Sequence, residues 1–111
     1  MKYAFLIYST GVAQDVLSAD EYQRLENAFA EVVRHPNASA AVRLQGPETA
    51  TAVRVENGKA LLADGPFVDS KEFLAGLIVL ELANLDVATE IATRLQEQRP
   101  DGAIEVRPIV E

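Results

Sequence analysis

The stretch Phe73-Leu74-Ala75-Gly76-Leu77-Ile78-Val79-Leu80-Glu81-Leu82 decides the fold, because its four residues 77–80 are all apolar. A β-strand turns successive side chains to opposite faces of its sheet, so an unbroken apolar run supplies both faces. The opening segment Ala4-Phe5-Leu6-Ile7 has the same property. Strands of this kind are typical of a sheet that is covered on both sides. We therefore expect residues 2–8 and 73–82 to be the central strands of a sheet.

Two helices are expected beside these strands. Ser18-Ala19-Asp20-Glu21 has the capping-box pattern that begins a helix. The apolar residues behind it recur at helical spacing and are Tyr22, Leu25, Phe29, Val32 and Val33. This helix should end near His35, because Pro36 disfavours helical geometry in the residue before it. A second helix is expected after Asn84, and its apolar stripe consists of Leu85, Ala88, Ile91, Ala92 and Leu95.

The dipeptide Asn57-Gly58 predicts a hairpin, since both residues tolerate the positive φ of a type I′ turn. A two-residue loop at this point pairs Val53 with Leu62, Arg54 with Leu61, Val55 with Ala60 and Glu56 with Lys59. Opposite charges then lie beside the turn and apolar contacts lie farther from it, which supports this register. The expected strands are 49–56 and 59–63.

Shorter elements complete the prediction. Strands are expected at 40–44 and 103–109, and Asp69-Ser70-Lys71-Glu72 is expected to cap a single helical turn. The order of elements predicts one α+β domain over residues 1–111, a ferredoxin-like sandwich of an antiparallel sheet with two helices. Right-handed crossovers place both helices on the same face of this sheet.

The second face of that sheet would be a large exposed apolar patch in a monomer. The same face of a second copy would cover it in a closed two-fold interface. We therefore expect a homodimer that packs through the sheet face. The alternative is a long loop folded over the sheet, and the expected loops are too short for it.

Composition excludes several classes of protein. The 111 residues include no cysteine, which rules out disulfides, thiolate zinc sites and a thiol nucleophile. The net charge of −7 argues against direct binding to nucleic acid. The sequence contains no metal-ligand constellation and no phosphate-binding loop, so we expect no cofactor. The apolar runs are too short for a signal peptide or a membrane span, so we expect a cytoplasmic protein.

Asp64 is the leading candidate for chemistry. It lies on the loop that follows the strand 59–63, directly before a glycine. Its carboxylate can be a general base or a hydrogen-bond acceptor for a ligand, or it can accept backbone hydrogen bonds that stabilise the turn. Phe67 either walls a pocket or anchors the core, and Lys71 and Glu72 either line the same cleft or cap a turn. Tyr8 ends the first strand and is a further candidate for the pocket.

Two other charged positions need an explanation. Glu81 interrupts an apolar strand, so it needs either a water-filled edge or a partner, which Arg43, Arg54 or Arg107 could be. Any of these arginines could also hold an anionic ligand through two parallel hydrogen bonds. His35, the one histidine of the chain, is expected at a helix end rather than in a catalytic role.

The segment Ala63-Asp64-Gly65-Pro66-Phe67, followed by Ser70-Lys71-Glu72 and Gly76, resembles the signature of the DGPF proteins, a branch of the YCII-related family. The opening Lys2-Tyr3 and the ending Glu105-Val106-Arg107-Pro108 also fit. The resemblance implies a dimeric α/β-barrel fold. Some relatives in this family resemble small enzymes with a histidine–aspartate pair in a cleft, and others are encoded beside, or fused to, sigma factors. The resemblance therefore implies either an enzymatic or a regulatory role. His35 does not stand early in the chain, where the catalytic histidine of such relatives is expected.

Three functions follow as hypotheses. The first is binding of a small molecule in a cleft near the Asp64–Phe67 loop, between the sheet, the helices and the 9–17 loop, with acid–base catalysis by Asp64. The second is a non-catalytic regulatory module that serves a sigma factor. The third is a structural dimer in which the motif at 64–67 builds a turn.

Overall fold

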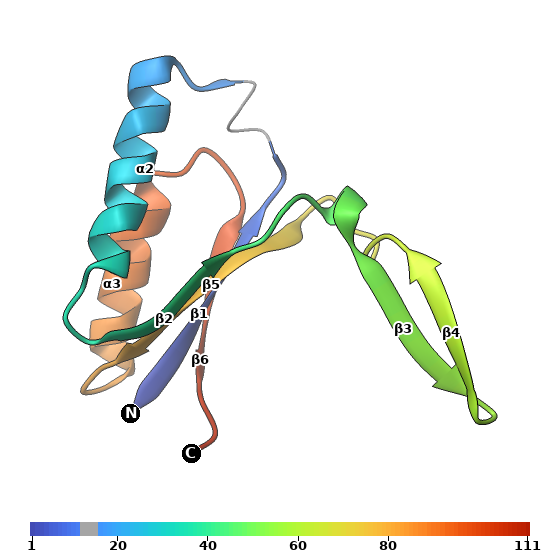
Figure 1. Ribbon diagram of the computed structural model, residues 1–111. Coiled ribbons are helices and arrows are strands. Elements are labelled where there is room, and N and C mark those ends of the chain that lie inside the picture. The colour runs from blue at the N-terminus through green and yellow to red at the C-terminus, as the bar shows by residue number, and fades with distance from the viewer. Residues whose placement is uncertain (12–15) are drawn as a thin grey trace.

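The computed structural model describes residues 1–11 and 16–111. Its elements, in chain order, are β1 (Lys2–Ser9), α2 (Ala19–Val33), β2 (Ala38–Arg43), the short 3₁₀ helix η1 (Pro47–Thr49), β3 (Thr51–Glu56), β4 (Lys59–Asp64), β5 (Phe73–Glu81), α3 (Leu85–Glu97) and β6 (Ala103–Pro108). Figure 1 shows a four-stranded sheet with both helices on one face and a hairpin that extends away from it. No helix of the described part of the chain is long and apolar enough to cross a membrane.

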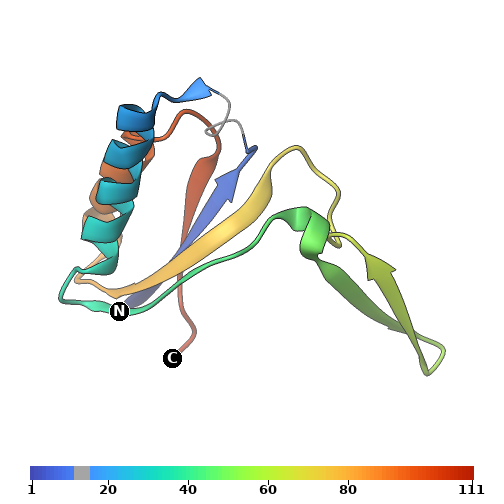
Figure 2. The same cartoon turned by 45° about the horizontal axis from the view of Figure 1, so that its top comes forward.

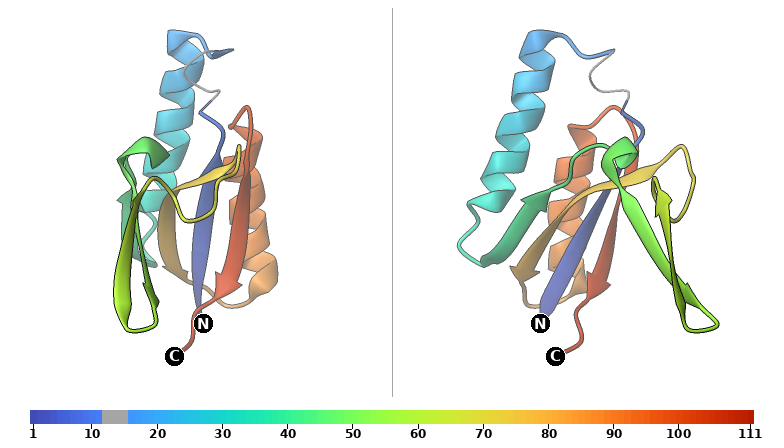
Figure 3. Two further views of the ribbon diagram at one scale, coloured as in Figure 1. Left: turned by 90° about the vertical axis from the view of Figure 1, so that its right-hand side faces the viewer. Right: turned by 45° about the vertical axis from the view of Figure 1, so that its right-hand side comes forward.

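The sheet has the strand order β2-β5-β1-β6, and all of its pairs are antiparallel. The predicted α+β ferredoxin-like fold is thus confirmed, with the apolar strands β1 and β5 in the middle. Leu6 pairs with Leu77 and Phe5 pairs with Ile78, so each face of the two central strands is apolar. Figure 3 shows that both helices lie behind the sheet when it is seen from the side of the hairpin.

The core lies between the sheet and the helices. Phe5, Ile78 and Leu80 are completely buried there. Helix α3 begins at the predicted cap, where the Asn84 side chain accepts a hydrogen bond from the backbone N–H of Val87 at 3.0 Å. Its buried residues are Ala88, Ala92 and Leu95. The small alanines let this helix approach the sheet closely.

Helix α2 also begins as predicted, because Ser18 and Glu21 form both hydrogen bonds of the capping box, at 3.1 Å each. It ends at Val33, two residues before the expected His35. None of its residues is fully buried. Its apolar stripe is therefore only partly covered by the core.

The hairpin of β3 and β4 has the predicted register, from Val53 opposite Leu62 to Glu56 opposite Lys59. It forms a separate two-stranded sheet, and we call residues 51–64 the arm. Its first strand begins at Thr51 rather than at residue 49, because Pro47–Thr49 form a 3₁₀ turn. Proline favours the first position of a helical turn, and the Thr49 hydroxyl donates to the Gly46 carbonyl at 2.7 Å. Figure 2 shows the arm as a ribbon that leaves the sheet.

The helical turn expected at 69–72 does not form. Instead the Ser70 hydroxyl accepts a hydrogen bond from the backbone N–H of Glu72 at 3.2 Å. Such a bond between residues i and i+2 competes with helix formation, and β5 begins at the next residue.

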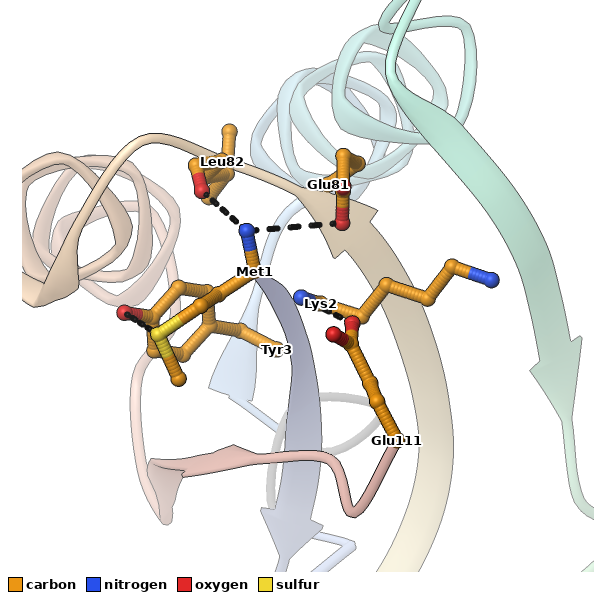
Figure 4. A network of polar contacts seen from close by, with 6 residues as sticks. All are labelled: Met1, Lys2, Tyr3, Glu81, Leu82 and Glu111. Carbon is orange, nitrogen blue, oxygen red and sulfur yellow. Dashed lines mark hydrogen bonds and ion pairs between the residues drawn. The ribbon is translucent and has the colours of Figure 1, made fainter.

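The N-terminal residue Met1 lies at the end of the sheet where β5 finishes, beside Glu81 and Leu82, as Figure 4 shows. The Met1 ammonium donates to the Leu82 carbonyl at 3.1 Å and lies 3.7 Å from the Glu81 carboxylate. Of the two alternatives for Glu81, the arginine partner is therefore wrong and the water-exposed edge fits. Both groups are more than half exposed, and such a pair contributes little to stability. Glu81 stands at the strand end, where water reaches it.

Candidate functional site

A cleft of about 600 Å³ lies between helix α2 and the end of the sheet that is farther from Met1 and Glu81. Strand ends of β1, β2 and β5, the turn at 46–48 and the start of the loop after α3 complete its wall. Its apolar and aromatic lining comprises Ile7, Tyr22, Leu25, Phe29, Leu44, Phe73, Ala75 and Leu95. Its charged lining comprises Glu26, Arg43, Glu48, Arg99 and Asp101.

The cleft exists because α2 and α3 pack differently. Helix α3 meets the sheet through small alanines, whereas α2 presents the rings of Tyr22 and Phe29 toward it. Tyr22 is 36% exposed, and Phe29 is only partly buried against the core. The aromatic residues of α2 therefore line an opening instead of a sealed interior.

Arg43 and Glu26 form the polar centre of the cleft. The Arg43 Nη2 atom lies 2.9 Å from the Glu26 Oε1 atom, in a hydrogen-bonded ion pair. The guanidinium also stacks on Phe29, with Cζ 4.5 Å from the ring centroid. This ion pair uses one nitrogen, and among the residues that the structure describes no other hydrogen bond engages the guanidinium, whose further donors suit a carboxylate or carbonyl oxygen. The half-exposed guanidinium thus lies between the Glu26 carboxylate and an aromatic wall.

Arg99 and Asp101 fix the floor of the cleft. Arg99 donates from Nη2 to the Tyr8 carbonyl at 2.6 Å and from Nη1 to the Gln96 Oε1 atom at 2.8 Å. Burial lowers the pKa of Arg99, and the Asp101 carboxylate acts in the opposite direction. Asp101 in turn accepts hydrogen bonds from the Thr10 backbone N–H at 2.7 Å and from the Thr10 hydroxyl. These bonds hold the end of β1 to the loop after α3.

Phe67 and Arg54 come together at the base of the arm, and neither they nor Asp64 belong to the lining of the cleft. The Arg54 guanidinium stacks on Phe67, with Cζ 4.7 Å from the ring centroid. Asp64 is exposed at the end of β4, opposite Thr51. Among the described residues, no hydrogen bond or ion pair reaches its carboxylate. The backbone N–H of Gly65 donates to the Ala50 carbonyl at 2.7 Å, which ties this loop to the turn at 47–49 that borders the cleft.

The other predicted site residues are separate from this group. Lys71 and Glu72 are exposed in the connection between the arm and β5. Tyr8 shares its side of β1 with Ala4 and Leu6, on the face opposite the helices, whereas the cleft is lined by Ile7 and Ser9. Its backbone carbonyl, not its hydroxyl, serves the cleft by receiving Arg99. Ligand binding by these three side chains stays a prediction.

His35 has a structural contact after α2. Its Nδ1 atom accepts a hydrogen bond from the backbone N–H of Asn37 at 3.1 Å, which stabilises the turn into β2. Across residues 1–11 and 16–111, no group of three or more histidine, aspartate or glutamate side chains is placed to hold a metal ion.

The sequence did not reveal the aromatic wall of the cleft. Tyr22, Leu25 and Phe29 were predicted only as apolar residues at helical spacing, which shows that a face is apolar without showing what covers it. Glu26, which lies inside that stripe between Leu25 and Phe29, was the available signal. A carboxylate in an apolar stripe indicates water or a cationic partner, and Arg43 is that partner.

The chain resembles known proteins over its whole length. The family model described as the YCII-related domain matches residues 1–111. An uncharacterized protein of Rhizobium meliloti (strain 1021) is 31% identical over 114 residues, which cover 98% of this chain and 92% of that protein. Among solved structures, the divalent cation tolerance protein Cut A1 of Thermus thermophilus has a TM-score of 0.42 and 16% identity. That alignment covers 100% of this chain and 86% of the other.

Proposed function

The chain belongs to the YCII-related domain family, and we propose that it binds a small, mostly apolar molecule with one carboxylate or carbonyl oxygen in the cleft walled by α2. The observation that carries the proposal is the Arg43–Glu26 pair on an aromatic wall in a cleft of about 600 Å³. Small-molecule sites are typically concave and apolar with a few convergent polar groups. The rings of Tyr22, Phe29 and Phe73 suit a flat apolar ligand.

Arg43 is the group that would receive the oxygen of the ligand. Arg99, the other cation of the cleft, is already engaged with Tyr8 and Gln96. Glu26 is the more buried member of its pair, with 28% of its side chain exposed against 54% for Arg43. An anionic ligand can therefore approach the exposed side of the guanidinium while Glu26 holds the other side. Asp64 lies outside the lining of this cleft, and catalysis by its carboxylate stays a prediction.

We also propose that the protein is a homodimer through the uncovered face of the sheet. The accessible surface is 7617 Å², whereas a compact monomer of 12.1 kDa is expected to expose about 6,000 Å². The excess of roughly 1,600 Å² is about twice what each partner of a standard interface buries. Val42 on this face is 47% exposed, beside Leu77 of β5. A second copy is the natural cover for a face that is apolar along both central strands.

The ligand proposal is tested by titrating the ¹⁵N-labelled protein with benzoate, and with benzamide as the neutral equivalent, in amide NMR spectra. We expect saturable shifts in residues around Tyr22, Phe29 and Phe73, with benzoate the tighter of the two. Arg43→Gln should weaken benzoate binding by about 10-fold, since it removes a charge-assisted hydrogen-bond donor.

Arg54→Gln is the matched control. Arg54 also stacks on a phenylalanine, at 4.7 Å against 4.5 Å for Arg43, and its side chain is 57% exposed against 54%. This variant should bind benzoate like the wild type. Shifts centred on Arg54 and Phe67 would place the site at the base of the arm instead. An absence of shifts up to the highest benzoate concentration reached would contradict the ligand site altogether.

The regulatory role beside a sigma factor, the assignment to the DGPF branch and the cytoplasmic location stay predictions. The cleft favours a ligand-binding role over a purely structural one, because a chain that needed only a dimer would gain by filling it with larger side chains.

A further inference from the structure

The two sides of the arm differ in chemistry. Residues that face each other across its strands point to the same side of the ribbon. One side carries Val53, Val55, Ala60 and Leu62 as its central residues, and the other carries Arg54, Glu56, Lys59 and Leu61 among others. An apolar side opposite a charged side is the pattern of a ribbon with one side buried and one in water.

The apolar side has no cover within the described chain. Val53, Val55 and Leu62 are 63%, 68% and 72% exposed. In the part of the chain that the structure describes, no hydrogen bond or ion pair joins residues 51–63 to the four-stranded sheet or to the helices. A lone two-stranded hairpin is at best marginally stable in water. Another molecule is therefore needed to cover the arm.

The charged side is already braced at its base. Phe67 folds back over Arg54, and Pro66 lies near Ala52 and Ala63 in the same shallow hollow. The Asp64-Gly65-Pro66-Phe67 loop thus supports one side of the arm and leaves the other bare.

The position of the arm identifies its cover. Figure 3 shows the arm on the side of the sheet opposite the helices. This is the side to which Leu6, Leu77 and Val42 of the sheet point. The radius of gyration is 15.8 Å, whereas a compact chain of this length is expected to have about 13 Å. A molecule that packs on the uncovered face therefore meets the arm as well.

The charge of the arm favours a second copy of the chain. Arg54 and Lys59 balance Glu56 and Asp64, so the arm is neutral, while the whole chain has a net charge of −7. A neutral arm adds no repulsion of its own against a copy with a charge of −7, and it has no excess charge to attract a nucleic acid or a strongly basic protein.

We propose that the arm is a clasp, whose apolar side of Val53, Val55, Ala60 and Leu62 packs against the second protomer of the dimer. The inference rests on the dimer of the proposed function and adds a second region to its interface. Two-fold symmetry lets each protomer give one arm and receive one.

Single cysteines test the clasp directly, because the natural chain has none. Val55→Cys, labelled with an environment-sensitive bimane, places a reporter on the apolar side, and Glu56→Cys places the same reporter on the charged side. Raising the protein concentration should shift the Val55→Cys emission to shorter wavelength, with the midpoint of dimer formation measured by sedimentation. The Glu56→Cys emission should stay constant.

Charged substitutions provide a second measurement that needs no label. Leu62→Asp should raise the dissociation constant of the dimer by roughly 100-fold or more, because two buried leucines are lost per dimer. Leu61→Asp, the neighbour on the charged side, should change it by less than about threefold. Circular dichroism of both variants shows whether the fold is retained.

The outcomes separate the two proposals. A dimer whose mass and dissociation constant are the same in Leu62→Asp, with no shift in Val55→Cys emission, would overturn the clasp and leave the sheet-face dimer. An emission at short wavelength that is independent of concentration would mean that the arm folds onto its own sheet, which also overturns the clasp. A protein that stays monomeric up to the highest concentration reached in sedimentation would overturn both the clasp and the dimer.

Discussion

The four-stranded body and the arm are built from similar residues yet stand at opposite extremes of burial. Phe5, Ile78 and Leu80 of the body are completely buried, whereas Leu62 of the arm is 72% exposed. Both regions are antiparallel and apolar on at least one side. The difference is that the body carries its own cover in α2 and α3. Secondary structure can thus be complete in both regions while only one of them has a core.

The largest expected contrast comes from truncating one buried and one exposed apolar side chain. Phe5→Ala should lower the free energy of unfolding by about 3–5 kcal/mol, because it leaves a cavity in the core. Leu62→Ala should change it by less than about 0.5 kcal/mol when the protein is dilute enough to be monomeric. Urea denaturation followed by circular dichroism measures both. A comparable loss in Leu62→Ala would show that the arm is packed within one chain.

Two glycines with positive φ sharpen the contrast. Gly102 has φ +74° and a Cβ atom there would strike the backbone carbonyl of Tyr8, whereas Gly58 at the tip of the arm has φ +77° and open space around it. Gly102→Ala should therefore cost about 2–4 kcal/mol, since strain and a backbone clash combine.

Gly58→Ala carries the strain without the clash. It should fray the hairpin turn and leave the urea midpoint of the body nearly unchanged, because the arm opens locally. Equal losses of stability in the two variants would mean that arm and body unfold as one unit.

The smallest expected effect depends on pH. Hydrogen bonding to the Ser18 backbone and side chain lowers the pKa of Glu21 below its ordinary value of 4.5. A carboxyl with a lowered pKa stabilises the folded state above its ordinary pKa, and that contribution is lost as pH falls through the lowered value. Glu21→Gln should thus be less stable than the wild type near neutral pH and equal to it in strong acid, once the carboxyl is protonated.

The matched variant on the arm is Glu56→Gln. Glu56 lies 3.9 Å from Arg54 in an exposed ion pair, which contributes little to stability. Urea midpoints of this variant should follow the wild type at both pH values. A stability difference in Glu21→Gln that persists unchanged in strong acid would contradict the role of its carboxylate in the cap.

The same contrast explains what could be predicted from the sequence. The register of the arm follows from Asn57-Gly58 alone, because a two-residue turn fixes which residues face each other. The central places of β1 and β5 follow from their apolar runs. Each of these conclusions needs only neighbouring residues or the composition of one strand.

What could not be predicted depends on residues far apart in the chain. The departure of the arm from the sheet and the distance of α2 from the sheet are set by packing that no local pattern records. Tyr22 and Phe29 have the spacing of a core helix and line a cleft instead. Asp64 and Arg43 are both near the end of a strand, and only the fold shows that Arg43 reaches the cleft wall while Asp64 does not.

The arm leaves the sheet and returns to it at neighbouring points. Arg43 and Gly76 are paired across β2 and β5, and the Leu44 N–H donates to the Ala75 carbonyl at 2.8 Å. The excursion over residues 44–75 therefore closes on itself, and the entropy of closing a loop grows only slowly with its length. Insertions or deletions near Asn57-Gly58 fall outside the register of the four-stranded sheet. Evolution can therefore lengthen or shorten the arm, and so change the surface that it presents to another molecule, while the four-stranded sheet keeps its strand order.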